Sequence, residues 1–165
     1  MALFPEEVFF VVQRYKKHQF SVKRGETVLK DKQEIFSFIL SLNDPYTHID
    51  VLNVYLSIRK KNVILQRKGR KGILDRLSKS KVYENVGESI INCMKKLEND
   101  QNCIFFSFKD KTSFLYNSFN ELYYLKSFEE TFNINYFLEI KQTCKDIEIH
   151  YFVLSTNAFK RFTIK

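Results

Sequence analysis

Apolar residues at helical spacing predict a helix at the start of the chain and a short hairpin after it. Residues 3–7 read Leu-Phe-Pro-Glu-Glu, which is typical of a helix start because proline fits the first turn and acidic residues favour the positive end of the helix dipole. Residues 8–12 are apolar on almost every side, so we expect this helix to be buried. Residues 19–22 and 27–28 predict two short strands joined across Gly25.

Two further helices are expected before residue 62. The first has Asp31 as its N-cap, with Glu34 three residues later, and apolar residues follow at helical intervals until Asn-Asp-Pro ends it at 43–45. Thr47 begins a possible capping box for the second helix. That helix ends in Arg59, Lys60 and Lys61, which suit the negative end of its dipole, and Asn62 suits its C-terminus.

A strand and a basic turn follow these helices. Residues 63–65 are a β-branched-rich run. Residues 66–72 contain the cations Arg67, Lys68, Arg70 and Lys71, which Gly69 and Gly72 punctuate. Helices, strand and turn together predict a winged-helix-like domain over residues 1–74. Domains of this kind bind nucleic acid or protein more often than they catalyse reactions.

The rest of the chain, residues 75–165, predicts a small α/β domain, so the fold class is α+β. A helical face runs along 82–97, and residues 119–125 fit either a helix or a strand. The apolar run 151–154 predicts a strand covered on both faces. Strand patterns lie at 103–108, at 134–140, at 147–154 after a turn near 145–146, and at 159–164.

Charge and cysteine content narrow the function classes. The net charge of +8 is concentrated in residues 59–81, which hold ten Lys and Arg against one acid, Asp75. This segment attracts phosphate or an acidic partner, unless it is simply a solvated face.

The cysteines are odd in number and widely spaced: Cys93, Cys103 and Cys144. This pattern indicates reduced core thiols, and we expect neither a metal nor a cofactor. Because no apolar run approaches the roughly 20 residues of a membrane span, we expect a soluble intracellular protein.

Several segments together resemble a known family. Residues 3–10 read LFPEEVFF, residues 29–36 read LKDKQEIF, and residues 54–56, VYL, precede VILQR at 63–67. In order and spacing these segments resemble the N-terminal domain of the structural subunit of tRNA-splicing endonuclease, the Sen fifty-four type. That family has a Leu-Leu-Pro-Glu-Glu-Ala helix, a second helix containing Gln-Glu-Ala-Tyr, and a helix leading into a strand.

The resemblance implies a non-catalytic subunit of a tRNA-intron splicing endonuclease. Its partners would be a catalytic subunit, the other subunits of the complex and precursor tRNA. Its location would be the nucleus or, as the alternative, the surface of an organelle, to which it would bind peripherally. Residues 75–165 would then be a tRNA-endonuclease-like α/β domain. The expected RNA-binding residues are the cations of the basic segment, Arg59, Lys60, Lys61, Arg67, Lys68, Arg70 and Lys71.

Catalytic subunits of this family use Tyr, His and Lys, in that order, in the C-terminal domain. His150 is the histidine in that part of the chain, with Tyr123, Tyr124 or Tyr136 before it and Lys160 or Lys165 after it. It lies inside an apolar strand pattern, whereas His18 and His48 lie near helix ends, so we interpret His150 as structural and expect no catalytic residue. Four glycines also argue against a nucleotide-binding loop.

Two other functions remain open from the sequence. A free-standing winged-helix accessory protein would insert residues 47–61 into a groove and place the 66–72 turn on phosphate. An active nuclease would use His150 and cut precursor tRNA alone. The first should be a stable monomer or homodimer that binds duplex, whereas a structural subunit should be poorly soluble without its partner.

Overall fold

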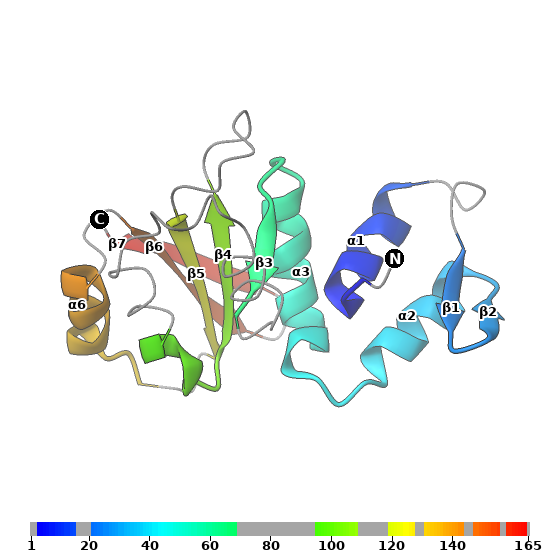
Figure 1. The fold of residues 1–165 in the computed structure, drawn as a ribbon, viewed down its shortest axis with the longest axis horizontal. Coiled ribbons are helices and arrows are strands. Elements are labelled where there is room, and N and C mark those ends of the chain that lie inside the picture. The colour runs from blue at the N-terminus through cyan, green and yellow to red at the C-terminus, as the bar shows by residue number, and fades with distance from the viewer. Residues whose placement is uncertain are drawn as a thin grey trace, which may run out of the picture. The chain divides into compact units, whose positions relative to one another are not determined.

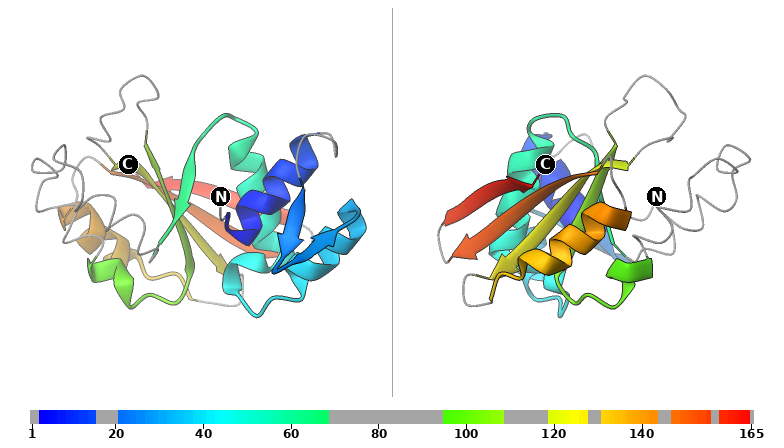
Figure 2. Two further views of the ribbon diagram at one scale, coloured as in Figure 1. Left: turned by 45° about the vertical axis from the view of Figure 1, so that its right-hand side comes forward. Right: turned by 90° about the vertical axis from the view of Figure 1, so that its left-hand side faces the viewer.

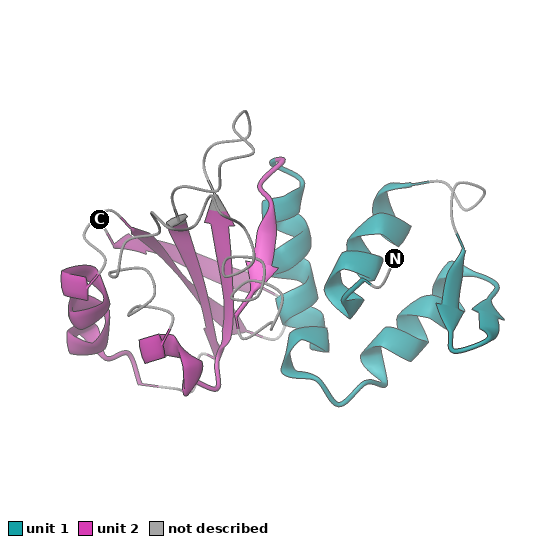
Figure 3. Cartoon of the chain, in the orientation of Figure 1, with its two compact units in different colours: residues 1–61 teal, residues 62–165 magenta. Residues whose placement is uncertain are grey.

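A computed structural model describes residues 3–15, 21–68, 95–108, 119–127, 131–143, 147–155 and 158–164 of the chain. The protein is mixed α+β, which confirms the expected fold class. It divides into two compact units, Met1–Lys61 and Asn62–Lys165 (Figure 3). The boundary expected at residue 74 lies outside the described residues. Of the strand expected at 63–65, only Leu65 is in a strand: the observed strand is Leu65–Arg67, which extends into the expected basic turn and pairs within the second unit.

The first unit consists of helices and a two-stranded hairpin (Figure 1). Its elements are α1 (Pro5–Arg14), β1 (Val22–Arg24), β2 (Thr27–Leu29), α2 (Lys32–Leu40), the 3-10 helix η2 (Pro45–Thr47) and α3 (Ile49–Arg59). The expected hairpin is present, but its first strand is Val22–Arg24 and not residues 19–22. It turns at Gly25, whose φ of 60° suits the first central position of a type II′ turn.

Local hydrogen bonds explain where α1 and α2 begin and where α3 ends. The Glu7 carboxylate accepts from the Phe4 backbone N–H at 2.8 Å, and Asp31 Oδ1 accepts from the Glu34 N–H at 2.8 Å. Both helix starts therefore follow the sequence prediction. α3 ends at Lys60, its C-cap, whose backbone N–H donates to the Leu56 carbonyl at 3.0 Å. The expected C-cap, Asn62, lies two residues later, where it adopts a left-handed φ of 61°.

The capping box expected to begin at Thr47 is wrong. The N-cap of α3 is His48, and Thr47 belongs to η2, where its hydroxyl donates to the Asp44 carbonyl at 2.7 Å. Asp44 itself caps η2, since its Oδ1 accepts from the Tyr46 N–H at 2.9 Å. Proline at the first position of that turn favours its early start, so the Thr47 side chain is already committed when α3 begins.

The helices of the first unit enclose a small apolar core. As predicted, α1 is largely buried: Phe9, Phe10 and Val12 are almost inaccessible. Side chains from α1, β2, α2 and α3 form one cluster, Phe9, Val12, Leu29, Ile35, Ile39 and Leu52. This cluster explains the spacing of apolar residues that predicted the helices.

The second unit is built on a five-stranded sheet of order β3-β4-β5-β6-β7 (Figure 1). Its elements are β3 (Leu65–Arg67), β4 (Cys103–Phe108), β5 (Phe119–Ser127), α6 (Ile134–Thr143), β6 (Glu148–Ser155) and β7 (Ala158–Ile164). Neighbouring strands are antiparallel except β5 and β6, which are parallel. The expected strands at 103–108, 147–154 and 159–164 are confirmed, and the ambiguous segment 119–125 is a strand. Of the helix expected at 82–97, residues 95–97 are helical and the remainder lies outside the described residues.

The strand expected at 134–140 is wrong, because this segment is the helix α6. The side chain of Asn133 accepts from the Tyr136 N–H at 3.3 Å, and Phe137 and Ile140 are buried one turn apart. The prediction failed because every second residue here is apolar or aromatic, which is also the pattern of a strand: Ile134, Tyr136, Leu138 and Ile140. The topology excludes a hairpin here, since parallel strands β5 and β6 need a crossover connection.

One face of the sheet and α6 share an apolar core, and α6 lies along that face (Figure 2). The core contains residues from β4, β5, β6, α6 and the segment before β4: Leu97, Ile104, Phe106, Leu122, Tyr124, Phe137, Ile140, Ile149 and Tyr151. Successive residues Tyr151 and Phe152 point to opposite faces, and both are buried, as predicted for this strand. Among the described residues, no helix is long and apolar enough to cross a bilayer.

Candidate functional site

Strand register brings a polar cluster together on the second face of the sheet. Tyr123 of β5 lies beside His150 of β6, which in turn lies beside Thr163 of β7. One step along the strands, Glu121 is opposite Glu148. Because residues two apart on a strand share a face, these side chains project to the same side of the sheet. We call Glu121, Tyr123, Glu148, His150, Arg161 and Thr163 the β5–β7 cluster.

His150 is the centre of the β5–β7 cluster and is completely buried, with 0% of its surface exposed. Its Nδ1 lies 2.7 Å from Arg161 Nη2, and because a guanidinium only donates, Nδ1 accepts this hydrogen bond. The imidazole is therefore neutral, with its proton on Nε2. Burial and the Arg161 charge lower the pKa of His150, while the nearby glutamates oppose that shift.

Two carboxylates face the other nitrogen of this imidazole. Glu121 Oε1 and Glu148 Oε1 each lie 3.5 Å from His150 Nε2. The Tyr123 hydroxyl donates to Glu121 Oε2 at 2.9 Å, and its ring centroid lies 4.7 Å from that of His150. Burial and this hydrogen bond to Glu121 raise the pKa of Tyr123, so the phenol is protonated near neutral pH.

The described residues do not bring a phenol, an imidazole and a lysine amine together in an open site. Tyr123 adjoins His150, but the imidazole is inaccessible. Lys160 pairs with Val153, so it projects to the face opposite His150. Lys165 lies outside the described residues. In this geometry no surface of His150 is open to a substrate hydroxyl, which an acid or base must approach.

Tyr124 and Tyr136, the other tyrosines considered, meet on the opposite face of the sheet. Both hydroxyls donate to Asp100 Oδ2 at 2.7 Å. Asp100 Oδ1 accepts from the backbone N–H and the side-chain amide of Asn102. Burial alone would raise the pKa of Asp100, but these hydrogen bonds outweigh it and lower the pKa; burial and the bond to Asp100 raise that of Tyr124. This network joins α6 to the sheet and exposes no reactive group.

The basic segment does not present its cations equally. Lys60 and Lys61, at the end of α3, are exposed. The Arg59 guanidinium lies 4.6 Å from the centroid of the Phe10 ring, so part of its role is packing. Arg67 and Lys68, in the second unit, are half-buried.

Burial lowers the pKa of Lys68, although Asp100 and Cys103 oppose the shift. Arg70 and Lys71 lie outside the described residues. Among the described cations of this segment, Lys60 and Lys61 are therefore the exposed ones that can meet phosphate.

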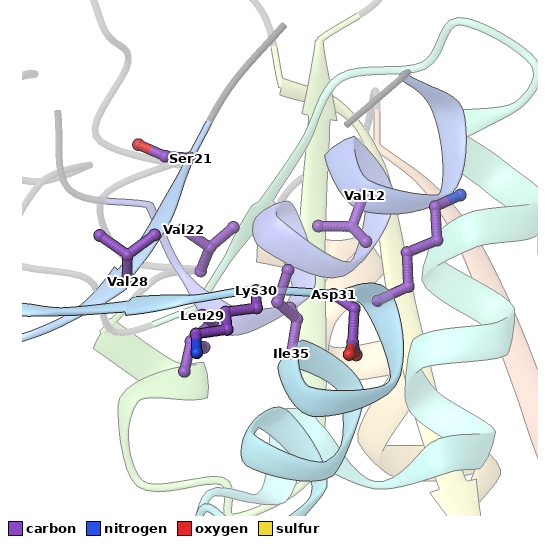
Figure 4. A pocket seen from close by; sticks show the side chains of 9 residues that line it. Val12, Ser21, Val22, Val28, Leu29, Lys30, Asp31 and Ile35 are labelled. Carbon is purple, nitrogen blue, oxygen red and sulfur yellow. The ribbon is translucent and has the colours of Figure 1, made fainter. Parts of the chain in front are cut away.

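The first unit also contains an apolar cavity of about 300 Å³ (Figure 4). The hairpin contributes Val22, Val28 and Leu29, and the helices contribute Val12 and Ile35. The charged residues at its edge include Asp31, whose carboxylate already caps α2. With this lining, the cavity offers no set of converging polar groups for catalysis.

The other candidate residues have simple positions. His48 is exposed at the start of α3, and His18 lies outside the described residues. Cys103 is buried and is not in a disulfide, as expected for a reduced core thiol, whereas Cys93 and Cys144 lie outside the described residues.

Sequence reasoning missed Glu121, Glu148 and Arg161. A signal was present, because Glu148 and His150 are two residues apart in a predicted strand and must share a face. The segment containing Glu121 and Tyr123, however, fitted a helix as well as a strand. Without the β5–β6 register, nothing in the sequence joins these two pairs.

No protein-family model matches this sequence, and no curated protein is significantly similar to it.

Proposed function

We propose that this chain is a non-catalytic, structural subunit of a tRNA-intron splicing endonuclease in the nucleus. The proposal rests on the order of the helices and strands that the segments resembling the family form. Residues 3–10 contain the start of α1, residues 29–36 contain the start of α2, and residues 54–56 lie in α3, which leads into β3. This is the helix, helix, helix-to-strand order of the family that the segments resemble.

The state of His150 supports a structural role. A fully buried, neutral imidazole that accepts a hydrogen bond from Arg161 is not available to a substrate. The chain would then contribute geometry to the reaction: it holds catalytic subunits at a fixed separation, so that the splice sites of a bound precursor tRNA meet them in position.

An exposed edge strand supports assembly with a partner. Within the described part of the chain, β7 is the last strand of the sheet, and its residues 158–163 are exposed. Phe159 and Phe162 are 40% and 54% exposed. An edge strand of this length offers unpaired backbone groups and apolar side chains to a strand of another chain. We assign β7 to the contact with the catalytic subunit, and Lys60 and Lys61 to the tRNA backbone.

Copurification tests this function. A tagged chain expressed in its own cells should retain a catalytic endonuclease subunit, identified by mass spectrometry. Phe162→Asp should reduce recovery of that subunit at least tenfold, because it puts a charge into the proposed contact. Leu138→Asp, at an exposed position of α6, is the matched control and should retain it.

A chain that purifies without any nuclease subunit, as a stable monomer or homodimer that binds duplex, would contradict the proposal. That result would favour the free-standing winged-helix protein. Equal recovery with Phe162→Asp and wild type would remove β7 from the contact.

A further inference from the structure

We infer that Glu121, Glu148 and His150 form a binding site for a divalent transition-metal ion of the Zn²⁺ type, which would link β5 to β6. This site does not depend on the proposed function. It also differs from the expectation drawn from the cysteines, because its ligands are two carboxylates and an imidazole.

The distances between the ligand atoms suit such an ion. Ligands about 2.0–2.1 Å from a tetrahedral zinc lie roughly 3.3–3.4 Å from one another. Each Oε1 of the two glutamates is 3.5 Å from His150 Nε2, and one ligand atom from each of the three residues lies within 4.8 Å of the other two. If the two carboxylate oxygens moved slightly closer to each other and to His150 Nε2, the three atoms would occupy three corners of a zinc tetrahedron.

The burial of the three side chains also fits a metal site. His150 is inaccessible, whereas the side chains of Glu121 and Glu148 are 16% and 29% exposed. The ion would therefore enter from the carboxylate side, where water can supply a fourth ligand. The Tyr123 hydroxyl bonds the outer oxygen of Glu121, which is the kind of second contact that orients a ligating carboxylate.

The register gives a physical reason for a cation at this place. Glu121 and Glu148 are directly opposite each other on neighbouring strands. Like charges in such a pair are destabilising, so the site favours positive charge. Arg161 supplies one such charge, and a divalent ion would supply more and bond the carboxylates directly.

Arg161 and the metal compete for the same imidazole. With Arg161 donating to Nδ1, the proton of neutral His150 is on Nε2, the nitrogen that a metal needs. For metal binding, Arg161 must withdraw and the proton must move to Nδ1, where Thr163 Oγ1, 3.4 Å away, can accept it. Arg161 can withdraw because it is on the exposed strand β7. Its guanidinium carbon lies 6.0 Å from the centroid of the Phe152 ring, so this ring can hold the guanidinium after it leaves the imidazole.

Calorimetric titration of the full-length chain with Zn²⁺, in the assembly in which it purifies, tests this site. Wild type should bind one equivalent per chain. Glu148→Gln should weaken binding at least tenfold, since it removes a ligand charge while keeping the shape of the side chain. Arg161→Met should strengthen binding at least tenfold, because no guanidinium has to be displaced.

Two controls keep the test decisive. Glu98→Gln changes an exposed glutamate outside the site and should leave binding unchanged. A thermal melt of each variant without metal checks that it is folded, and saturating Zn²⁺ should raise the Tm of wild type and Arg161→Met but not of Glu148→Gln. Absence of Zn²⁺ binding in both wild type and Arg161→Met would overturn the site, as would binding that Glu148→Gln leaves unchanged.

Discussion

At the residue scale, Asp100 shows how one polar side chain holds two elements of the second unit together. Its carboxylate accepts hydrogen bonds from Tyr124 on β5, from Tyr136 on α6 and from Asn102. A half-buried carboxylate is stable at this position because each of its oxygens has donors. This arrangement fixes the start of β4 and the position of α6 at the same time.

Asp100→Asn should lower the free energy of unfolding at pH 7 by about 1.5–3 kcal/mol, the scale of hydrogen bonds to a charged group. After the substitution, the amide oxygen can accept from the two tyrosines only if the NH₂ group faces the N–H groups of Asn102. These are also donors, so their hydrogen bonds are lost. Urea denaturation of wild type and variant measures the difference. Asp50→Asn, in the first turn of α3, is the matched control and should change stability by less than about 0.5 kcal/mol.

The pH dependence of this difference follows from the lowered pKa of Asp100. Its pKa is below the usual 3.8 in the folded protein, so the unfolded chain binds the proton more readily. The stability that the carboxylate contributes is therefore complete well above pH 3.8 and is lost as the pH falls through its folded pKa. The gap between wild type and Asp100→Asn should be constant from pH 7 to about 5 and narrow below 3.8; a gap that widens in acid would contradict this role.

At the element scale, α6 lies in the crossover between the parallel strands β5 and β6. It packs on the sheet through two buried side chains, Phe137 and Ile140. Phe137 is 3% exposed and packs against Tyr124 and Tyr151, while its neighbour Leu138 is 47% exposed. Two apolar residues that are adjacent in sequence therefore differ almost completely in burial. This difference alone fits a helix or a strand. The helix is distinguished by the burial of both Phe137 and Ile140, because residues three apart share a face in a helix and lie on opposite faces of a strand.

Phe137→Ala should lower the free energy of unfolding by about 3–5 kcal/mol, since it removes a buried ring and leaves a cavity. Leu138→Ala should change it by no more than roughly 0.5 kcal/mol. Chemical denaturation of both variants provides the measurement. Comparable losses for the two variants would mean that α6 does not pack as described.

The sequence predicted those elements whose local signals agree with their final packing. Caps at Glu7 and Asp31, the glycine turn at Gly25 and the apolar run of β6 act within a few residues, so they were visible in advance. α6 was mistaken for a strand because its apolar residues fit both periods. The deciding fact, the parallel pairing of β5 with β6, joins segments more than 20 residues apart.

At the scale of the whole molecule, the positive charge is the feature that most directly suggests a nucleic-acid partner. Composition alone predicted a basic segment at 59–81 but not which cations are available. The structure distinguishes the exposed Lys60 and Lys61 from Arg59, which lies on Phe10, and from the half-buried Lys68. The β5–β7 cluster could not be predicted in the same way, because it depends on the register of three strands.

Lys60→Glu combined with Lys61→Glu should weaken binding to precursor tRNA and reduce the dependence of log K on log salt by roughly 1.5 units, if each lysine neutralises one phosphate. Filter binding across a salt series measures this slope. The same reversal at Lys30 and Lys32, which are exposed at the start of α2, is the control and should leave the slope unchanged. Equal effects of the two pairs would indicate general electrostatic attraction rather than a defined contact.

The most direct test of a structural subunit is the cleavage of intron-containing precursor tRNA by material copurified with the tagged chain. The copurified complex should cut at the splice sites at the same rate with wild-type chain and with His150→Gln, and the isolated chain should not cut. Cleavage by the isolated chain that is lost in His150→Gln would contradict the proposal, as would a copurified fraction without splice-site cleavage.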